Sequence, residues 1–146
     1  MAARKKTNAP WVTAIVEHDG QPLALRVRPA ADSAANRLRY PRVALVSHEL
    51  SKVTSNGLPE ARYNDLLTDF DHDVHSFVER GADGIVVLVE TFSGKRNYYA
   101  YVVDDARLKA RVDELRAKYP QHSLSVRGGA DGEWKVFNEY RRRFPW

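Results

Sequence analysis

Short stretches rich in β-branched and aliphatic side chains, separated by turn-forming residues, open the chain. Residues 11–18 and 22–28 are two such stretches. The Asp19-Gly20-Gln21 segment between them predicts a β-hairpin, because Asp-Gly favours the tight turns that join antiparallel strands. Residues 29–40 are small, polar and aperiodic, which predicts a long irregular connection. This connection leads to a third predicted strand at residues 41–49.

Two amphipathic helices are predicted from apolar residues that recur every three or four positions. The first spans residues 59–80, and the second follows the N-cap residue Asp104 and ends before Pro120. The apolar stripe of the first helix contains Leu66, Leu67, Phe70, Val74, Phe77 and Val78. The stripe of the second contains Leu108, Val112, Leu115 and Tyr119. Each stripe occupies one side of its helix, so we expect both helices to pack against a sheet.

The remaining segments predict three strands and a last helix. Residues 85–90 form an apolar run of strand length, and residues 91–95 turn the chain back into a strand at 96–103. Residues 122–127 alternate between apolar and polar side chains, which is typical of a strand. The aromatic residues within 131–146 recur at roughly helical spacing and predict a short carboxyl-terminal helix.

The order of these elements is ββ, then βαββαβ, then a short helix. It predicts an α+β fold, specifically a ferredoxin-like βαββαβ sandwich with an added N-terminal β-hairpin and a short C-terminal helix. The strand at 85–90 would be an edge of that sheet although it is apolar on both faces. We therefore expect the N-terminal hairpin or a second subunit to cover it. Residues 11–146 are predicted to form a single domain after a flexible basic arm at residues 1–10.

Composition narrows the classes of protein to consider. The chain of 146 residues contains no cysteine, which excludes disulfides, thiolate metal ligands and a cysteine nucleophile. The start of the chain has no apolar run typical of a signal peptide. No segment approaches the roughly 20 apolar residues of a membrane helix. These features predict a cytoplasmic protein that does not associate with membranes.

The net charge of +4 is concentrated at the two ends of the chain. Arg4, Lys5 and Lys6 lie near the start, and Arg141, Arg142 and Arg143 lie near the end. The residues between these two clusters include 17 basic and 19 acidic side chains. The basic ends could contact phosphates, but charge runs of this kind are more often solvated ends without a specific ligand.

A polar cluster within the first predicted helix raises the question of a metal site. If Phe70 and Val74 face inward, then His72, His75 and Glu79 face outward and lie about one helical turn apart. That spacing could hold a divalent cation, but metal sites on helices usually draw ligands from a second element. We predict a solvated acidic face with no metal and no cofactor.

The sequence contains no local signature of catalysis. Hydroxyl, histidine and carboxyl side chains are present without the spacing that joins a nucleophile to its base. The glycine pairs at 81–84 and 128–129 lack the further glycine or the Lys-Ser/Thr of phosphate-binding loops and predict turns. An enzyme hypothesis rests only on His48 or His75 as a base near neutral pH.

The predicted strand at 96–103 combines a basic residue with alternating aromatic rings. Tyr99 and Tyr101 share one face of that strand, close in sequence to Arg96. If this face were open, the rings could stack on bases of single-stranded nucleic acid. Packing beneath other elements is the more common role of tyrosines on a central strand.

Several short motifs occur in a distinctive order and resemble a bacterial family. They are Trp11, Gly57-Leu58-Pro59, Thr91-x-x-Gly94-x-Arg96, Tyr98-x-x-Tyr101 and Asp131-x-x-Trp134. Between Trp11 and Pro145 the chain resembles the domain of unknown function 695 family. That family is similar to the regulator of ribonuclease activity B, a ferredoxin-like protein that acts by binding a ribonuclease. The resemblance implies binding to another protein.

These observations favour a non-enzymatic regulatory or protein-interaction module. Its candidate binding surface comprises Arg96, Tyr99, Tyr101 and Trp134, because aromatic residues and arginine are enriched where proteins bind one another. Two alternatives stay open: single-stranded nucleic-acid binding through the tyrosine strand and the basic ends, and a small hydrolase or transferase with a histidine base. A homo-oligomer could form through an edge strand.

Overall fold

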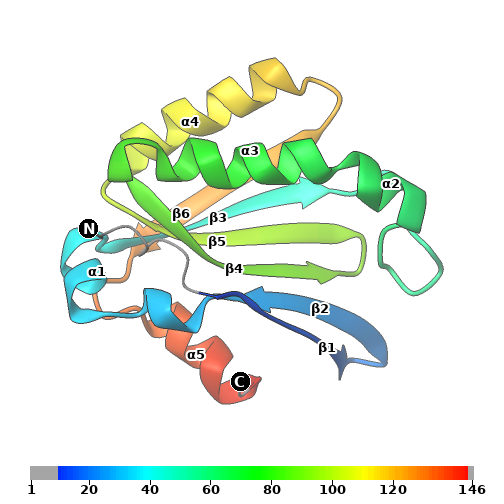
Figure 1. The fold of residues 1–146 in the computed structure, drawn as a ribbon, viewed down its shortest axis with the longest axis horizontal. Helices are drawn as coiled ribbons and strands as arrows, with labels where there is room; N and C mark the ends of the chain where they lie inside the picture. Colours follow the sequence, from blue (N-terminus) through cyan, green and yellow to red (C-terminus); the bar gives the residue numbers. More distant parts are fainter. Residues whose placement is uncertain (1–9, 145–146) are drawn as a thin grey trace.

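The computed structural model describes residues 10–144 and contains one six-stranded antiparallel sheet with helices on both faces (Figure 1). The strands are β1 (Val12–His18), β2 (Gln21–Val27), β3 (Arg42–Glu49), β4 (Gly84–Phe92), β5 (Lys95–Val102) and β6 (Ser123–Ala130). The helices are α1 (Ala34–Arg39), α2 (Ala61–Leu66), α3 (Thr68–Glu79), α4 (Asp105–Lys118) and α5 (Lys135–Arg143). Two 3-10 turns, η2 (Pro29–Ala31) and η3 (Arg80–Ala82), complete the described elements. The predicted α+β class is confirmed.

The strands lie in the order β1-β2-β4-β5-β3-β6. β2 pairs with β4 from Ala24 opposite Thr91 to Val27 opposite Leu88. The N-terminal hairpin therefore covers the apolar β4, as predicted, and removes a strand edge that would otherwise expose hydrophobic side chains. The ferredoxin-like prediction applied to the segment from β3 to β6. In the structure the strands of this segment lie in the order β4-β5-β3-β6, and each neighbouring pair is antiparallel.

Two hydrophobic cores lie on opposite faces of the sheet. α3 and α4 cover one face, and α5 with the 29–40 segment lies against the other (Figure 1). The core under α3 and α4 includes Phe70, Val74, Val78, Tyr98, Leu108, Val112 and Leu115. The core under α5 includes Leu23, Leu25, Val27, Tyr101, Trp134 and Phe137. Since β4 contributes to both, its continuous apolar run is explained by burial on both sides.

The 29–40 segment is not the irregular connection predicted from its composition. It forms η2 and α1, and the Ser33 hydroxyl caps α1 by accepting a hydrogen bond from the Asn36 N–H at 3.1 Å. Asn36 in turn donates through its side-chain amide to the Ala31 carbonyl at 2.7 Å. A capping serine before small residues was the local signal for this helix.

The helix predicted at 59–80 is divided into α2 and α3 at Leu67. The predicted apolar stripe is wrong at Leu66, whose side chain is 76% exposed, whereas Leu67 is buried. The Leu67 N–H bonds to the Asn64 carbonyl at 3.1 Å, which marks a tighter turn at the junction. The break gives α2 its own direction and brings its last turn toward the end of the β4–β5 hairpin.

Gly57 fixes the loop before α2 onto the β4–β5 turn. Its carbonyl accepts a hydrogen bond from the Gly94 N–H at 2.8 Å. Its φ is +85°, and a Cβ at this position would lie 2.8 Å from the Cα of Ser93. The backbone of Ser93 cannot yield as a flexible side chain could, so only glycine fits here.

We expect Gly57→Ala to lower the free energy of unfolding by about 2 kcal/mol or more, because the new methyl group adds a backbone clash to the cost of a positive φ. Gly20→Ala is the matched control, since Gly20 has a φ of +76° but open space around its Cα. It should cost only about 1 kcal/mol. Urea unfolding of the two variants measures the difference, and equal losses would contradict the close contact with Ser93.

Candidate functional site

A groove of mixed polar and apolar lining lies between the β1–β2 hairpin and the junction of α2 with α3. Two cavities of about 470 and 260 Å³ share Arg26 and Arg96 and form what we call the arginine groove. The strands contribute Thr13, Ile15, Ala24 and Thr91, and the helices contribute Asn64, Thr68 and Asp71. The groove exists because the β1–β2 hairpin extends the sheet beyond the area that α3 and α4 cover (Figure 1).

Arg96 lies across the groove and is held by neutral acceptors. Its Nε donates to the Thr91 Oγ1 at 2.9 Å, and its Nη2 donates to the Asn64 Oδ1 at 2.9 Å. Among residues 10–144, no carboxylate pairs with this guanidinium. Arg96 is therefore a positioned positive charge whose ionic partner is not supplied by the described part of the chain.

Arg26 is also in the groove, but its charge is compensated. Its Nη1 and Nη2 donate to the two carboxylate oxygens of Asp71 at 3.2 and 2.7 Å. The Tyr98 hydroxyl donates to the Asp71 Oδ1 at 2.7 Å. Burial alone would raise the pKa of Asp71, but the hydrogen bonds and charge of Arg26, with the Tyr98 hydroxyl, lower that pKa below its ordinary value. With Asp71 ionised, Arg26, Arg96 and Asp71 together carry one excess positive charge.

Arg96 does not share a face with the tyrosines predicted to accompany it. Successive side chains of a strand point to opposite faces, so Arg96 and Tyr98 face α2 and α3. Tyr99 and Tyr101 face α5, and the Tyr99 ring lies 5.3 Å from the Tyr140 ring. The expectation of one surface around Arg96, Tyr99 and Tyr101 is therefore wrong. Because side chains of a strand alternate between its two faces, the sequence already indicated that residue 96 lies on the opposite face from residues 99 and 101.

Tyr101 and Trp134 are part of the core rather than the surface. Both are fully buried, and their rings stack with centroids 4.0 Å apart and planes 10° apart. The Trp134 Nε1 donates to the Tyr40 carbonyl at 3.0 Å, and the Tyr101 hydroxyl donates to Asp131 at 2.7 Å. α5 covers this face, so the Tyr101 ring is not accessible for stacking on a base. The packing alternative considered for these residues is the observed one.

Of the two basic ends, the described residues include only the carboxyl-terminal one, whose three arginines are exposed. The predicted arm at residues 1–10 lies outside the described residues except for Pro10. At the other end, Arg142 pairs with Glu139, and Arg143 approaches His18 at 3.3 Å. These contacts belong to α5 and β1 and leave the arginine groove separate from the terminal arginines.

His48 and His75, the two candidate bases, are fully buried and half-buried respectively, and both lie among aromatic rings. His48 is fully buried, with ring centroids 4.7 Å from Phe70 and 4.8 Å from His122. His75 lies between Trp11 and Tyr98, at 5.4 and 5.9 Å, rather than outward as predicted. Burial lowers the pKa of each to about 4. Neither ring lines the arginine groove.

The three side chains of the first helix that were weighed as metal ligands, His72, His75 and Glu79, do not share one face in the structure. Glu79 is engaged elsewhere: its carboxylate accepts from Arg28 at 3.2 Å and from the Val86 N–H at 2.9 Å. His72 is exposed, whereas His75 is packed under Trp11. Within residues 10–144 no group of three or more histidine or acidic side chains is placed to hold a metal ion.

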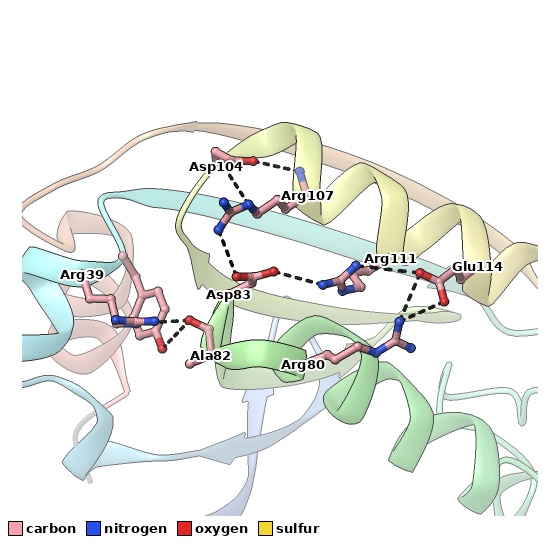
Figure 2. Close-up of polar contacts among 9 residues, drawn as sticks. Arg39, Arg80, Ala82, Asp83, Asp104, Arg107, Arg111 and Glu114 are labelled. Carbon is pink, nitrogen blue, oxygen red and sulfur yellow. Dashed lines mark hydrogen bonds and ion pairs between the residues drawn. The ribbon is translucent and has the colours of Figure 1, made fainter.

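A second arginine-rich cluster joins the start of β4 to α4 (Figure 2). Asp83 accepts hydrogen bonds from Arg107 at 3.1 Å and from Arg111 at 3.0 Å. Arg80 pairs with Glu114 at 3.0 Å on the same side of the molecule. Each of these three guanidiniums has a carboxylate partner, so these ion pairs connect α4 to the segment before β4. Arg96 differs from them because its partners are neutral oxygens.

The fold and the groove define an α+β domain with an arginine-containing groove at the uncovered end of its sheet. Residues 9–140 match a family of unknown function, DUF695, and the chain belongs to this family, as its motifs indicated. No curated protein and no solved structure matches the chain. The resemblance to the regulator of ribonuclease activity B stays a prediction. No described helix is both long enough and apolar enough to span a membrane.

Proposed function

We propose that this protein is a non-enzymatic protein-interaction module that binds an acidic segment of a partner protein in the arginine groove. The observation that supports this function is the Arg96 guanidinium, which Thr91 and Asn64 hold in place without an opposing carboxylate. Arginine binds carboxylates through a planar fork of N–H donors, and such charge-assisted bonds are about twice as strong as neutral ones. A partner carboxylate would therefore find a donor already fixed in position.

The surroundings of Arg96 favour a peptide over a nucleic acid. Two apolar side chains, Ile15 and Ala24, line the groove, and Ile15 is 69% exposed. Neither cavity of the groove is lined by an aromatic ring for base stacking. Asp71 also offsets one of the two positive charges. An acidic residue next to an apolar one, on an extended segment, complements this combination.

The test is capture of partners by the tagged protein from lysate of its own cells, after nuclease treatment. Arg96→Gln should weaken retention of a specific protein by about tenfold or more, since a hydrogen bond to a charged group is worth about 1.5–3 kcal/mol. Arg142→Gln is the matched control, because it removes an equal charge from an exposed position on α5, away from the groove. Thermal unfolding verifies that both variants fold.

Retention that is equal in Arg96→Gln and in the parent protein would contradict the proposed site. Loss of all retained material on nuclease treatment would instead indicate that the groove or another surface binds phosphates. A synthetic peptide of alternating glutamate and valine provides a direct probe. Its binding should shift the NMR signals of the Arg96 and Asn64 side chains, and a peptide with glutamine in place of glutamate should not.

A further inference from the structure

β1 is an edge strand of the described sheet, and one side of it carries a regular row of backbone groups that no residue of 10–144 binds. Its described pairing is with β2, in a register that runs from Val12 opposite Val27 to His18 opposite Gln21. Asp19 and Gly20 have φ values of 52° and 76°, which is the signature of a two-residue type I′ turn. In such a hairpin the residues flanking the turn, His18 and Gln21, form a hydrogen-bonded pair.

The orientation of every backbone group on β1 follows from that pair. Hydrogen-bonded and non-bonded positions alternate along an antiparallel ladder. The residues bonded to β2 are therefore Val12, Ala14, Val16 and His18. The N–H and C=O groups of Thr13, Ile15 and Glu17 point away from β2, toward the open edge that is drawn in dark blue in Figure 1. These three residues present a ladder ready to accept another strand.

β1 carries few of the usual protections of an edge strand. Its sequence, Val-Thr-Ala-Ile-Val-Glu-His, has one charged residue, Glu17 near the turn, but neither lysine nor proline, and its pairing with β2 runs without a bulge. Ile15, at its centre, is 69% exposed, and Val12 is 39% exposed. An apolar residue at the middle of a free edge is typical of a strand that pairs with another chain.

We propose that β1 pairs antiparallel with β1 of a second copy of this chain, with Ile15 on the two-fold axis. In this register Ile15 lies opposite Ile15, and Thr13 lies opposite Glu17 of the second copy. Every outward N–H and C=O of Thr13, Ile15 and Glu17 then has a partner, because the segment is symmetric about its centre. The two sheets join into one continuous sheet across the axis.

Charge and register favour the alignment centred on Ile15 over other alignments of the two β1 strands. Centring the pair on Glu17 would oppose two carboxylates directly, which is destabilising, and centring it on Thr13 would place Glu17 opposite residue 9, outside the described strand. A shift by one residue would place the groups that β2 already binds against the partner. Centring on Ile15 instead sets Glu17 beside a threonine hydroxyl and brings the two exposed isoleucines together.

The two-fold axis is perpendicular to the joined sheet, so both arginine grooves would open on the same face. This arrangement would present two equivalent sites to a partner, which raises the effective affinity for a repeated or dimeric ligand. The dimer does not depend on the proposed function, because its evidence is the free ladder of β1 rather than Arg96.

Cysteine cross-linking tests the register, because the chain contains no cysteine of its own. Opposite residues of a hydrogen-bonded pair have Cα atoms about 5.5 Å apart, within the range of about 4.4–6.8 Å for a disulfide. Ile15→Cys should therefore form a covalent dimer under mild oxidation. Thr13→Cys alone should not, since its two copies would lie about 14 Å apart along the strands, at about 3.4 Å per residue. Thr13→Cys combined with Glu17→Cys should restore the cross-link.

Sedimentation of the parent protein over a range of concentrations tests the association itself. The mass should rise toward twice that of the monomer, and Ile15→Lys should keep the protein monomeric by placing two ammonium groups at the axis. At concentrations low enough for the parent to be monomeric, this variant should unfold at the same temperature as the parent, because Ile15 is exposed. A parent protein that stays monomeric at the highest attainable concentration would overturn the proposal. So would a dimer that Ile15→Lys leaves intact, or one that Thr13→Cys alone cross-links as well as Ile15→Cys.

Discussion

Trp134→Ala is expected to lower the free energy of unfolding by about 3–5 kcal/mol, as for other buried tryptophans. The indole is fully buried and stacks on Tyr101 at 4.0 Å between ring centroids. Its Nε1 donates to the Tyr40 carbonyl at 3.0 Å, which links the start of α5 to the end of α1. Truncation would open a cavity beneath α5 and leave the Tyr40 carbonyl without this donor.

Urea unfolding of Trp134→Ala and Trp134→Phe separates the contribution of ring packing from that of the Nε1 hydrogen bond. Phenylalanine keeps a ring against Tyr101 but loses the N–H, so its loss of stability should be smaller than that of alanine. Lys135→Ala is a control on the exposed side of α5 and should change the free energy by less than about 0.5 kcal/mol. A loss below about 1 kcal/mol for Trp134→Ala would show that this residue is not a core anchor.

The second large effect expected is a loss of stability as the pH falls from about 6.5 to about 4. The ordinary pKa of histidine is 6.5, and burial lowers the pKa of His48 and of His75 to about 4 in the folded protein. The unfolded chain therefore binds protons in this range while the folded chain does not. Stabilisation from the two neutral rings is fully present above pH 6.5 and is lost as the pH falls. Each ring should contribute about 3 kcal/mol.

Urea unfolding at a series of pH values measures this dependence. His48→Leu and His75→Leu should each flatten part of the slope between pH 6.5 and 4, since leucine cannot bind a proton. His72→Gln is the matched control, because His72 lies on the same helix as His75 but is exposed. Asp71, whose pKa is lowered, should add its own loss of stability only at more acidic pH. A stability that is constant from pH 6.5 to 4 would contradict the lowered pKa values of His48 and His75.

The family motifs acquire different physical roles in the structure. Gly57 is required by a close backbone approach, Arg96 is positioned in the groove, and Trp134 fills the core. Sequence reasoning grouped Arg96 and Trp134 into one surface because arginine and aromatic side chains are the common composition of binding sites. Aromatic side chains also fill hydrophobic cores, and only their burial distinguishes a core residue such as Trp134 from a binding-site residue.

The sequence by itself determined the elements that depend on local patterns. The Asp19-Gly20 turn, the strand at 85–90 and the helix after Asp104 are encoded within a few neighbouring residues each, through turn conformation, apolar runs and capping. The need to cover the apolar β4 was also visible, because an edge strand that is apolar on both faces is unstable in water.

Only the tertiary structure decided which surfaces remain open. The burial of Tyr101 depends on α5, which lies far along the chain, and the groove depends on how β2 pairs with β4 and on the helix break at Leu67. These contacts join residues distant in sequence, and their free energy comes from burying shared apolar area rather than from local propensity. The periodicity of one segment cannot tell which distant segment will cover it, and so Arg96 was recognised while its true neighbours were not.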